Sequence, residues 1–252
     1  MKRVLILALL LCRIMPAVAH DIAPKGDGAL RIMCYNVHNF VGMDGLRDYQ
    51  RIADVINEAA PDVVAIQEAD SAAQRSGGAY TLKELAGRTS MIPTYAPAID
   101  FQGGKYGVGI LSKEKPLSVR QTPLPGREER RTLLLVEFET YVLACTHFSL
   151  NAEDRLASVA LINEAVKGIT KPLFLAGDMN SVPDSPPQVA LRQTFNILND
   201  ITQNTIPVVN PSKCIDYIYQ YRNGKDCSVL KRQVIPEEMA SDHLPLFVDV
   251  KY

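Results

Sequence analysis

Short apolar runs recur along the chain and predict β-strands, because polar, Gly or Pro residues bound each run. Some runs, such as PLFLA, are apolar at successive positions, so both faces of the strand must be covered. The predicted strands are Arg31–His38, Val63–Gln67, Tyr106–Ser112, Thr132–Phe138, Tyr141–Phe148, Pro172–Ala176, Ile215–Tyr219 and Leu246–Val250.

Helical spacing of apolar residues appears between some of these strands. One helix is predicted over Leu46–Ile56, and a second begins where Thr81 and Glu84 form a capping-box pattern. The third is the clearest, because Asn151 can cap its start and Gly168 can end it. Helices therefore alternate with some strands and can cover the outer faces of sheets.

Two strands follow one another almost directly, around Glu139-Thr140, and this connection predicts an antiparallel hairpin. Other connections contain helices, which parallel neighbours require. The pattern therefore predicts mixed sheets with helices on their outer faces, in an α+β fold.

Polar side chains end or interrupt five of the apolar runs. In LAGDMNSVPDS the acid Asp178 and the amide Asn180 lie two residues apart, and Gly177 leaves room beside them. Alternate strand residues share a face, so both oxygen-bearing groups can converge on a phosphate or a hard cation. Comparable polar groups interrupt the other runs at Asn36, Glu68, His147, and Asp242 with His243.

Each polar group also has a structural explanation when taken alone. Asn36 and Glu68 can be polar residues where a strand meets a loop, and His147 can be a hydrogen-bonded histidine near the core. Asp216 in CIDYIY can accept from a buried backbone donor. Taken together, however, the groups would cost desolvation energy at every strand unless they meet, so a shared functional site is favoured.

The order of these motifs resembles the endonuclease/exonuclease/phosphatase superfamily, which includes deoxyribonuclease I, and the resemblance spans residues 31–250. Its components in chain order are NVHNF, Gln67-Glu68, KYGVGILS, the ERR run, THFSL, GDMNSVPDS, IDYI and SDHLPL. The resemblance implies a four-layer α/β/β/α sandwich of two mixed β-sheets flanked by helices. This agrees with the mixed sheets that the apolar pattern predicts.

The same resemblance implies a metal site and a phosphoester substrate. Glu68 would be the direct metal ligand, with Asn36 and Asp242 close to the hydrated ion. Mg²⁺ fits, because a hard dication held by one or two carboxylates keeps several waters and can bind a phosphate oxygen. Mn²⁺ is the alternative ion, and schemes with one or two metals both stay open.

The resemblance also implies which residues handle the proton of the attacking water. His243 would be the general base, with Asp216 fixing its tautomer and stabilising the imidazolium. Asp178 would orient the water or a second metal, and whether Asp178 or His243 acts as the base stays open.

Three further residues would face the phosphate by the same resemblance. His147 would stabilise the negatively charged phosphorane or protonate the leaving oxygen, and Asn180 would donate to the phosphate. Tyr106 can add a hydroxyl donor.

The first nineteen residues have the composition of a signal peptide. Lys2 and Arg3 precede an apolar run, and Ala17 to Ala19 supply small residues for a cleavage site. The apolar run is too short to span a bilayer unaided, so a stable membrane anchor is disfavoured. We therefore expect export to the periplasm or the medium after cleavage near Ala19, and a single domain over residues 20–252.

Cleavage would make the chain mildly acidic. It removes Lys2, Arg3 and Arg13 from 27 basic residues and leaves 24 against 28 acidic residues, a formal charge of −4. Such a charge gives no overall attraction to nucleic acid, although a local patch such as Arg127, Arg130 and Arg131 could hold backbone phosphates. The alternative for that cluster is a solvated loop before a strand.

Four cysteines would remain in the exported chain. Cys34 and Cys145 lie in apolar strands and are expected to be buried thiols. Cys214 and Cys227 flank YQYRNGKD, where Asn223-Gly224 predicts a hairpin turn, so a disulfide between them is an open alternative in an oxidising compartment.

Several classes of function remain open. We expect a secreted phosphodiesterase of nuclease type, acting on a phosphoester with nucleic acid as one candidate. The chain has no tryptophan, which disfavours the inositol phosphatase relatives, whose matching motifs carry it. A sphingomyelinase-like lipid phosphodiesterase and a small-phosphoester phosphatase are the alternatives, and a non-catalytic binding module is a third. The natural substrate, endo or exo action and the oligomeric state are left open.

Overall fold

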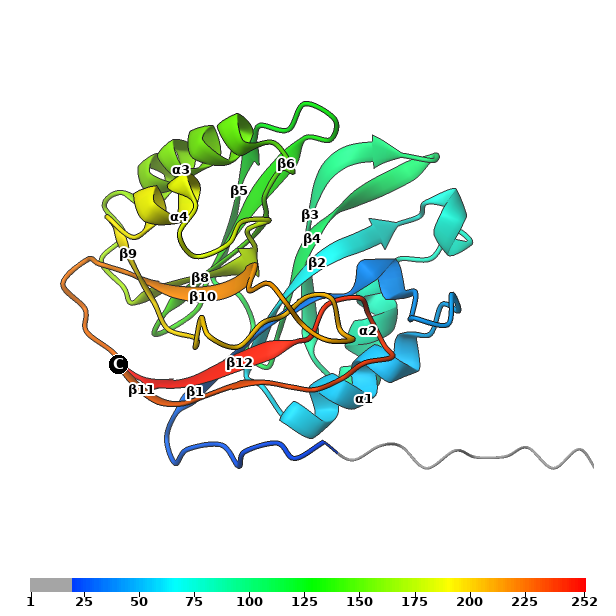
Figure 1. Ribbon diagram of the computed structural model, residues 1–252, viewed down its shortest axis with the longest axis horizontal. Coiled ribbons are helices and arrows are strands. Elements are labelled where there is room, and N and C mark those ends of the chain that lie inside the picture. The colour runs from blue at the N-terminus through cyan, green and yellow to red at the C-terminus, as the bar shows by residue number, and fades with distance from the viewer. Residues whose placement is uncertain (1–19) are drawn as a thin grey trace, which may run out of the picture.

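Two β-sheets packed face to face, with helices on both outer faces, make up the structure, a computed structural model that describes residues 20–252 (Figure 1). The layers run from α3 and α4, through both sheets, to α1 and α2. The predicted four-layer α/β/β/α sandwich is therefore confirmed. The expected signal peptide lies outside the described residues.

The first sheet has the strand order β11-β12-β1-β2-β4-β3. Its β1 and β2 pair in parallel, whereas β12 pairs antiparallel with β1, so the sheet is mixed. Its strands are β1 (Leu30–Asn36), β2 (Val63–Ser71), β3 (Ile92–Phe101), β4 (Gly104–Ser112), β11 (Ser228–Val234) and β12 (Leu246–Lys251).

The second sheet has the order β5-β6-β7-β8-β10-β9 and is also mixed, because β7 and β8 pair in parallel. The predicted hairpin at Glu139-Thr140 is confirmed, since it joins antiparallel β6 and β7. Its strands are β5 (Ser118–Leu124), β6 (Arg131–Glu137), β7 (Val142–His147), β8 (Leu173–Asp178), β9 (Phe195–Ile197) and β10 (Asp216–Tyr221).

Helices cover each sheet with their apolar residues. Ile52 and Ile56 of α1 and Leu82 and Leu85 of α2 pack on the outer face of the first sheet, while Ile162 of α3 packs on the second. A third apolar cluster fills the space between the sheets. The helices are η1 (His38–Phe40), α1 (Tyr49–Ala59), η2 (Gln74–Ser76), α2 (Thr81–Thr89), α3 (Ala152–Val166) and α4 (Pro186–Leu191).

The helix starts test the predicted caps. Asn151 caps α3 as expected, because its side chain accepts from the backbone N–H groups of Glu153 and Asp154. The capping box at Thr81 is wrong: Thr81 is the first residue of α2, and its hydroxyl donates to the backbone oxygen of Asp70. Leu46 also lies outside a helix, because α1 begins at Tyr49.

The predicted hairpin around Asn223-Gly224 is wrong. β10 belongs to the second sheet and β11 to the first, so this turn carries the chain from one sheet to the other. The Asn223 side chain donates to the backbone oxygens of Ile169 and Lys171 and holds the crossing in place. A turn signal fixes local direction but not the sheet that the next strand joins.

No disulfide joins Cys214 and Cys227, and all four cysteines of the described chain are free thiols. The sulfur of Cys214 lies 3.7 Å from the backbone oxygen of Asp216, and that of Cys227 lies 3.0 Å from Gln220 Oε1. Cys34 and Cys145 are buried, as expected.

Gly177 allows β7 and β8 to approach one another next to the polar strand ends. A Cβ at this position would lie 2.1 Å from the backbone oxygen of Thr146, which cannot move away cheaply. We expect Gly177→Ala to lower the free energy of unfolding by about 1–3 kcal/mol. In Gly87→Ala, the matched control in α2, a Cβ meets nothing within 4 Å, and stability should rise. Urea denaturation measures both, and an unchanged midpoint for Gly177→Ala would contradict this account.

Candidate active site

The predicted polar residues gather at one end of the two sheets. Asn36, His147 and Asp178 each end a strand, β1, β7 and β8 respectively. Asp216 begins β10, which is antiparallel to β8, and His243 precedes β12, which is antiparallel to β1. Strand direction therefore brings all five to the same edge of the sandwich, and the face-to-face packing brings the two sheets' contributions together.

The side chains of Asn36, His147 and His243 converge on one oxygen atom, Asp178 Oδ2. Asn36 Nδ2 donates to it at 3.1 Å, while His147 Nε2 and His243 Nε2 lie 3.4 and 3.7 Å away. Asp178 itself is only 2% exposed. Three nitrogens from three separate strand ends thus surround a single buried carboxylate.

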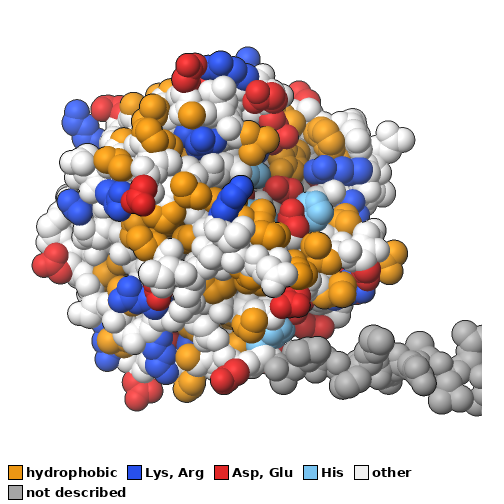
Figure 2. All heavy atoms as spheres, viewed as in Figure 1, with side chains coloured by type: hydrophobic (Ala, Val, Ile, Leu, Met, Phe, Trp, Pro, Cys, Tyr) orange, Lys and Arg blue, Asp and Glu red, His pale blue; other side chains and the backbone are white. Residues whose placement is uncertain are grey.

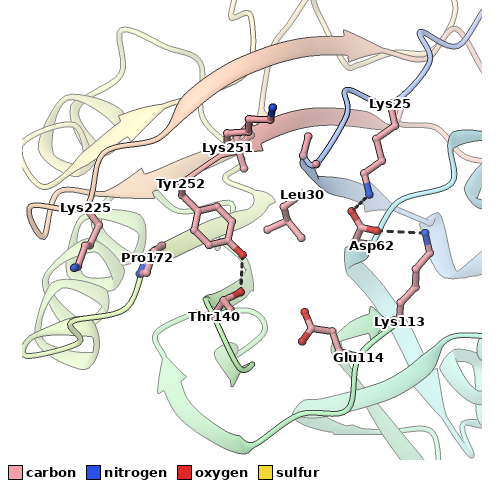
Figure 3. Close-up of a pocket in the computed structure, with 13 residues that line it drawn as sticks. Lys25, Leu30, Asp62, Lys113, Glu114, Thr140, Pro172, Lys225, Lys251 and Tyr252 are labelled. Atoms are coloured by element: carbon pink, nitrogen blue, oxygen red, sulfur yellow. Dashed lines mark hydrogen bonds and ion pairs between the residues drawn. The ribbon is translucent and has the colours of Figure 1, made fainter.

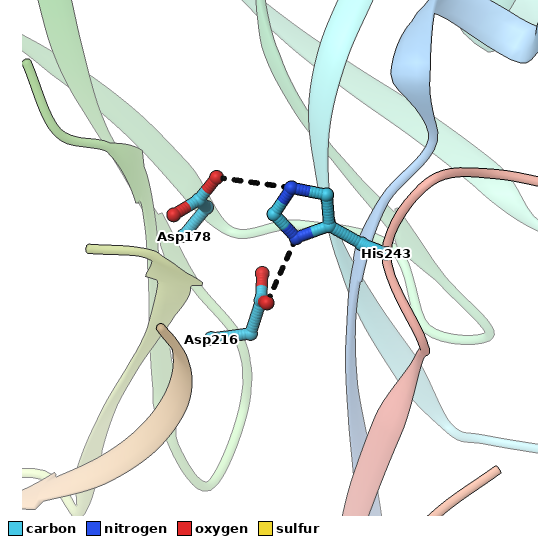
Figure 4. A group of neighbouring side chains, drawn as sticks. All are labelled: Asp178, Asp216 and His243. Atoms are coloured by element: carbon cyan, nitrogen blue, oxygen red, sulfur yellow. Dashed lines mark hydrogen bonds and ion pairs between the residues drawn. The ribbon is translucent and has the colours of Figure 1, made fainter. Parts of the chain in front are cut away.

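His243 is held on its other side by Asp216, as the resemblance implies. Its Nδ1 lies 2.9 Å from Asp216 Oδ2, which also accepts from the Thr205 hydroxyl at 2.5 Å. Figure 4 shows the ring with one nitrogen toward Asp178 and the other toward Asp216. Because a carboxylate only accepts, Nδ1 carries a proton, and Nε2 faces the reacting side.

Burial and charge shift the protonation of this group. Burial raises the pKa of Asp178, and the nearby charge of Asp216 raises it further, from 3.8 to about 7. Burial alone would lower the pKa of His243, but the charges of Asp216 and Asp178 and the hydrogen bond to Asp216 raise it instead. Asp178 and His243 therefore exchange protons as a pair rather than as independent groups.

Glu68 reaches the same site through an irregularity in β2. The register of β2 against β4 shifts between Ile66 and Ala69, and Glu68 has a φ of 64° within this bulge. Such a bulge turns one side chain away from the regular alternation of the strand. Asn36 Nδ2 donates to Glu68 Oε1 at 3.1 Å, so this amide joins Glu68 to Asp178.

Asp242 lies at the edge of the site. Its carboxylate is 3.9 Å from His38 Nδ1, and it is tied to Asn36 indirectly, because Ser241 Oγ donates to the Asn36 backbone oxygen. Glu68 is half-buried and Asp242 is partly exposed, so both carboxylates can take part in binding a hydrated ion. Carboxylate and amide oxygens are the donors that a hard dication prefers, and the predicted metal residues fit that chemistry.

A second group of ligand atoms lies close together. Within residues 20–252, Asp178, Asp216 and His243 are the set whose ligand atoms all lie within 4.8 Å of one another. His243 Nδ1 and Asp216 Oδ2 already share a proton in a 2.9 Å hydrogen bond, so a cation there would have to displace it. The arrangement therefore suits proton transfer better than metal binding.

His147 contacts a residue whose role the sequence analysis missed. Arg131 Nη1 lies 3.2 Å from His147 Nδ1, and a guanidinium only donates, so Nδ1 accepts and Nε2 carries the proton toward Asp178. Burial, with the charges of Arg131 and His243, lowers the pKa of His147 well below its usual value. His147 is thus a neutral donor rather than an acid.

The structure places the members of the arginine cluster differently. Arg131 is only 8% exposed and turns inward, and Arg127 is paired with Glu153 and lies 3.6 Å from Asp154. The ERR motif offered the one sequence signal for Arg131, but only the fold shows that β6 starts beside the end of β7.

We expect Arg131→Met to reduce kcat by about 10- to 100-fold, because His147 loses the donor that fixes its tautomer. Arg130→Met is the matched control, since Arg130 is the exposed residue directly before Arg131, and it should stay within twofold of the wild type. The tautomer is read directly from the ¹⁵N shifts of His147. An unchanged tautomer and unchanged kcat in Arg131→Met would refute the role.

Asn180 and Tyr106 complete the site from two sides. Asn180 lies two residues after Asp178 and has a φ of 45°. The backbone N–H of Asn180 donates to Asp178 Oδ1, and the side-chain amide of Asn180 donates to the Phe148 backbone oxygen. Tyr106 is 7% exposed, and burial raises the pKa of its hydroxyl, which therefore keeps its proton. Tyr106, Arg131 and His147 line one small recess.

A large cavity lies at the opposite end of the sandwich. It has a volume of about 820 Å³ and is lined by the start of β1, the end of β12 and the turns before β2 and β8 (Figure 3). Lysines line it, and two of them, Lys25 and Lys113, bind Asp62. None of the predicted catalytic or metal residues lines this cavity.

Comparisons with known proteins agree with the geometry. The sequence pattern of the endonuclease/exonuclease/phosphatase family matches residues 33–243. No curated protein matches the chain. An endonuclease/exonuclease/phosphatase from Beutenbergia cavernae DSM 12333 is similar in structure, with a TM-score of 0.73, 23% identity, and coverage of 88% of this chain and 71% of that one.

Two Bacteroides structures are also similar. The endonuclease/exonuclease/phosphatase from Bacteroides vulgatus has a TM-score of 0.74 and 17% identity, with 88% of this chain and 98% of that one covered. A mannosyl-6-phosphatase from Bacteroides thetaiotaomicron VPI-5482 has a TM-score of 0.70 and 16% identity, with 88% and 100% covered. At these identities the likeness establishes the fold alone.

Proposed function

Because this chain belongs to the endonuclease/exonuclease/phosphatase family, whose members are phosphoester hydrolases, we propose that it is a metal-dependent phosphodiesterase of nuclease type. The observation that carries the proposal is the convergence of Asn36, His147 and His243 on Asp178 Oδ2. Buried acids and imidazoles at a shared point cost stability, and hydrolysis is the chemistry that uses them together.

In this proposal each residue of the site has a separate role in hydrolysis. Asp216 orients His243, and the Asp178–His243 pair takes the proton from the attacking water. His147, kept neutral, donates from Nε2 to a phosphate oxygen as negative charge develops there. Tyr106 adds an O–H donor on the same side.

We propose Mg²⁺ as the cofactor, with Mn²⁺ as the alternative. Glu68 would hold the ion directly, and Asn36 and Asp242 would bind its water shell. When bound, the ion supplies a positive charge that polarises the phosphoryl group.

The charge of the site supports a diester over a monoester substrate. Glu68, Asp178 and Asp216 place three carboxylates around the site, and His243 is the imidazole that lies between two of them. A phosphodiester carries one negative charge near neutral pH and a monoester nearly two. The bound dication and Arg131 are the cations that would offset this charge beside the carboxylates, and a diester needs less of that compensation. A small-phosphoester phosphatase is therefore the less favoured alternative.

A nucleic-acid substrate would have to bind by local contacts. On the face that Figure 2 shows, basic and acidic side chains are interspersed rather than gathered by sign. The formal charge of −4 expected after cleavage gives no overall attraction to nucleic acid, so binding would depend on individual contacts to phosphates, and their number would set its salt dependence.

A lipid phosphodiester is the second candidate, and a specific observation favours it. Loops at the site end of the sheets expose large apolar side chains, and two of these loops touch, because the Met43 N–H donates to the Met239 backbone oxygen. Apolar loops around a site can contact a membrane surface. These exposed residues are Met43, Leu46, Leu150, Val182 and Met239.

We further propose that the protein acts outside the cytoplasm, in the periplasm or the medium, after cleavage near Ala19. The basic start and apolar run of residues 1–19 support this location. Among the helices of residues 20–252, none has the length and apolar character to cross a membrane.

A substrate panel tests the proposal. The protein, with Mg²⁺, Mn²⁺ or a chelator, is incubated with plasmid DNA, single-stranded RNA, sphingomyelin vesicles, bis(p-nitrophenyl) phosphate and p-nitrophenyl phosphate. We expect chelator-sensitive cleavage of nucleic acid and of the diester ester, with the monoester cleaved at least tenfold more slowly. Preferential cleavage of sphingomyelin would choose the lipid candidate, and no cleavage of any substrate would favour a binding module.

A further inference from the structure

His20, the first residue that the structure describes, contacts two glutamates, Glu58 and Glu237. Its backbone N–H donates to Glu58 Oε1 at 2.7 Å, and its Nδ1 lies 2.7 Å from Glu58 Oε2. Its Nε2 lies 2.9 Å from Glu237 Oε2. The side chain is only 6% exposed.

Two carboxylates, those of Glu58 and Glu237, face His20, and a positive group between them would be stabilised. Carboxylates only accept hydrogen bonds, so the backbone N–H and the ring of His20 face acceptors alone. Glu58 is the penultimate residue of α1, and a negative charge at the C-terminal end of a helix is unfavourable. A positive group held against Glu58 removes that disadvantage.

We propose that Glu58 and Glu237 form a binding site for a free N-terminal histidine, generated by hydrolysis of the Ala19–His20 peptide bond. Water adds across that bond, leaving a carboxylate on Ala19 and an α-ammonium on His20. The backbone nitrogen already 2.7 Å from Glu58 then carries a full positive charge, and its contact with Glu58 becomes an ion pair. This inference rests on the proposed export and is independent of the proposed catalytic chemistry.

The site links the mature N-terminus to the loop that carries His243. Glu237 uses its other oxygen, Oε1, to accept from the backbone N–H groups of Met239 and Ala240. Ala240 is followed by Ser241, whose hydroxyl donates to the Asn36 backbone oxygen. Docking of His20 therefore stabilises the loop between β11 and the catalytic histidine.

The next residues of the segment hold it along the first sheet. The Ala23 N–H donates to Gln233 Oε1, and the Ala23 oxygen accepts from Arg31 Nη2. These contacts do not require a free amine, so they bring His20 to Glu58 before and after cleavage. The ammonium is the new element that cleavage adds.

Two measurements test the proposal. The N-terminus of the exported protein is sequenced, and His20 is expected as its first residue. Thermal unfolding is then compared between a form that begins at His20 and one extended by Ala19, both in wild-type and Glu58→Gln backgrounds. The form with the free amine should melt about 2 °C higher at low salt, and the difference should vanish in Glu58→Gln. Glu238→Gln, an exposed neighbour, should keep the full difference.

Equal melting temperatures for the two forms, or the same difference in Glu58→Gln as in the wild type, would overturn the proposed amine site. A mature N-terminus at another residue would overturn the cleavage position. Neither result depends on whether the protein cleaves a phosphodiester, so a failure here is separate from a failure of the proposed activity.

Discussion

Asp178→Asn is expected to reduce turnover by about 10³-fold or more while leaving the protein folded. The amide keeps the size of the carboxyl and can still accept from Asn36, but it cannot take a proton from water. Asp184→Asn is the matched control, because Asp184 is an exposed acid in the same GDMNSVPDS motif. That variant should retain wild-type kcat.

The same substitution should stabilise the metal-free protein at high pH. The folded-state pKa of Asp178 is raised to about 7, so folding favours its protonated form, and stability falls as pH rises from about 4 through 7. Asparagine stays neutral throughout. In chelator, the variant should therefore melt above the wild type at pH 8, by more than about 4 °C, and the two should converge at pH 4.

Calorimetry across this pH range, together with steady-state kinetics, checks both halves of the prediction. A variant that keeps near-wild-type kcat would remove Asp178 from the proton-transfer step. A variant that melts below the wild type at pH 8 would mean that the buried charge is compensated in the folded protein.

Glu68→Gln is expected to have the second largest effect, a loss of about 10²- to 10³-fold in kcat/KM at a fixed, moderate Mg²⁺ concentration. The amide keeps the contact position beside Asn36 but loses the negative charge that attracts a dication. Raising Mg²⁺ or Mn²⁺ should recover part of the activity. Glu128→Gln, an exposed acid on the loop before β6, serves as the control.

Metal titrations of activity and isothermal titration calorimetry with Mn²⁺ measure this effect. The expected result is weaker binding in Glu68→Gln and unchanged binding in Glu128→Gln. Unchanged Mn²⁺ affinity in Glu68→Gln would show that the ion is held elsewhere.

The sequence predicted the strands that are buried on both faces, because their continuous apolar runs leave a clear signal. Strands with polar or proline-containing sequences were missed, such as IPTYAPAIDF in β3 and SVRQTPL in β5. The three-residue β9 and the alternating β11 were missed as well. Edge and half-exposed strands are defined by their hydrogen-bonded neighbours, which a local pattern does not contain.

The residues of the site could be predicted because polar groups at the ends of apolar strands are costly unless they meet. The contacts that these residues make could not be predicted. The inward turn of Arg131 and the support of Asp216 by Thr205 depend on the packing of segments that are remote in sequence or belong to loops. The bulge that redirects Glu68 is set by the pairing of β2 with β4, and its left-handed backbone leaves no mark in VVAIQEAD.

Anomalous diffraction from crystals soaked in Mn²⁺ tests the division between metal binding and proton transfer most directly. We expect a peak about 2.2 Å from a carboxylate oxygen of Glu68, with the hydrogen bond between His243 and Asp216 intact. A single peak enclosed by Asp178, Asp216 and His243, with Glu68 uncoordinated, would contradict it.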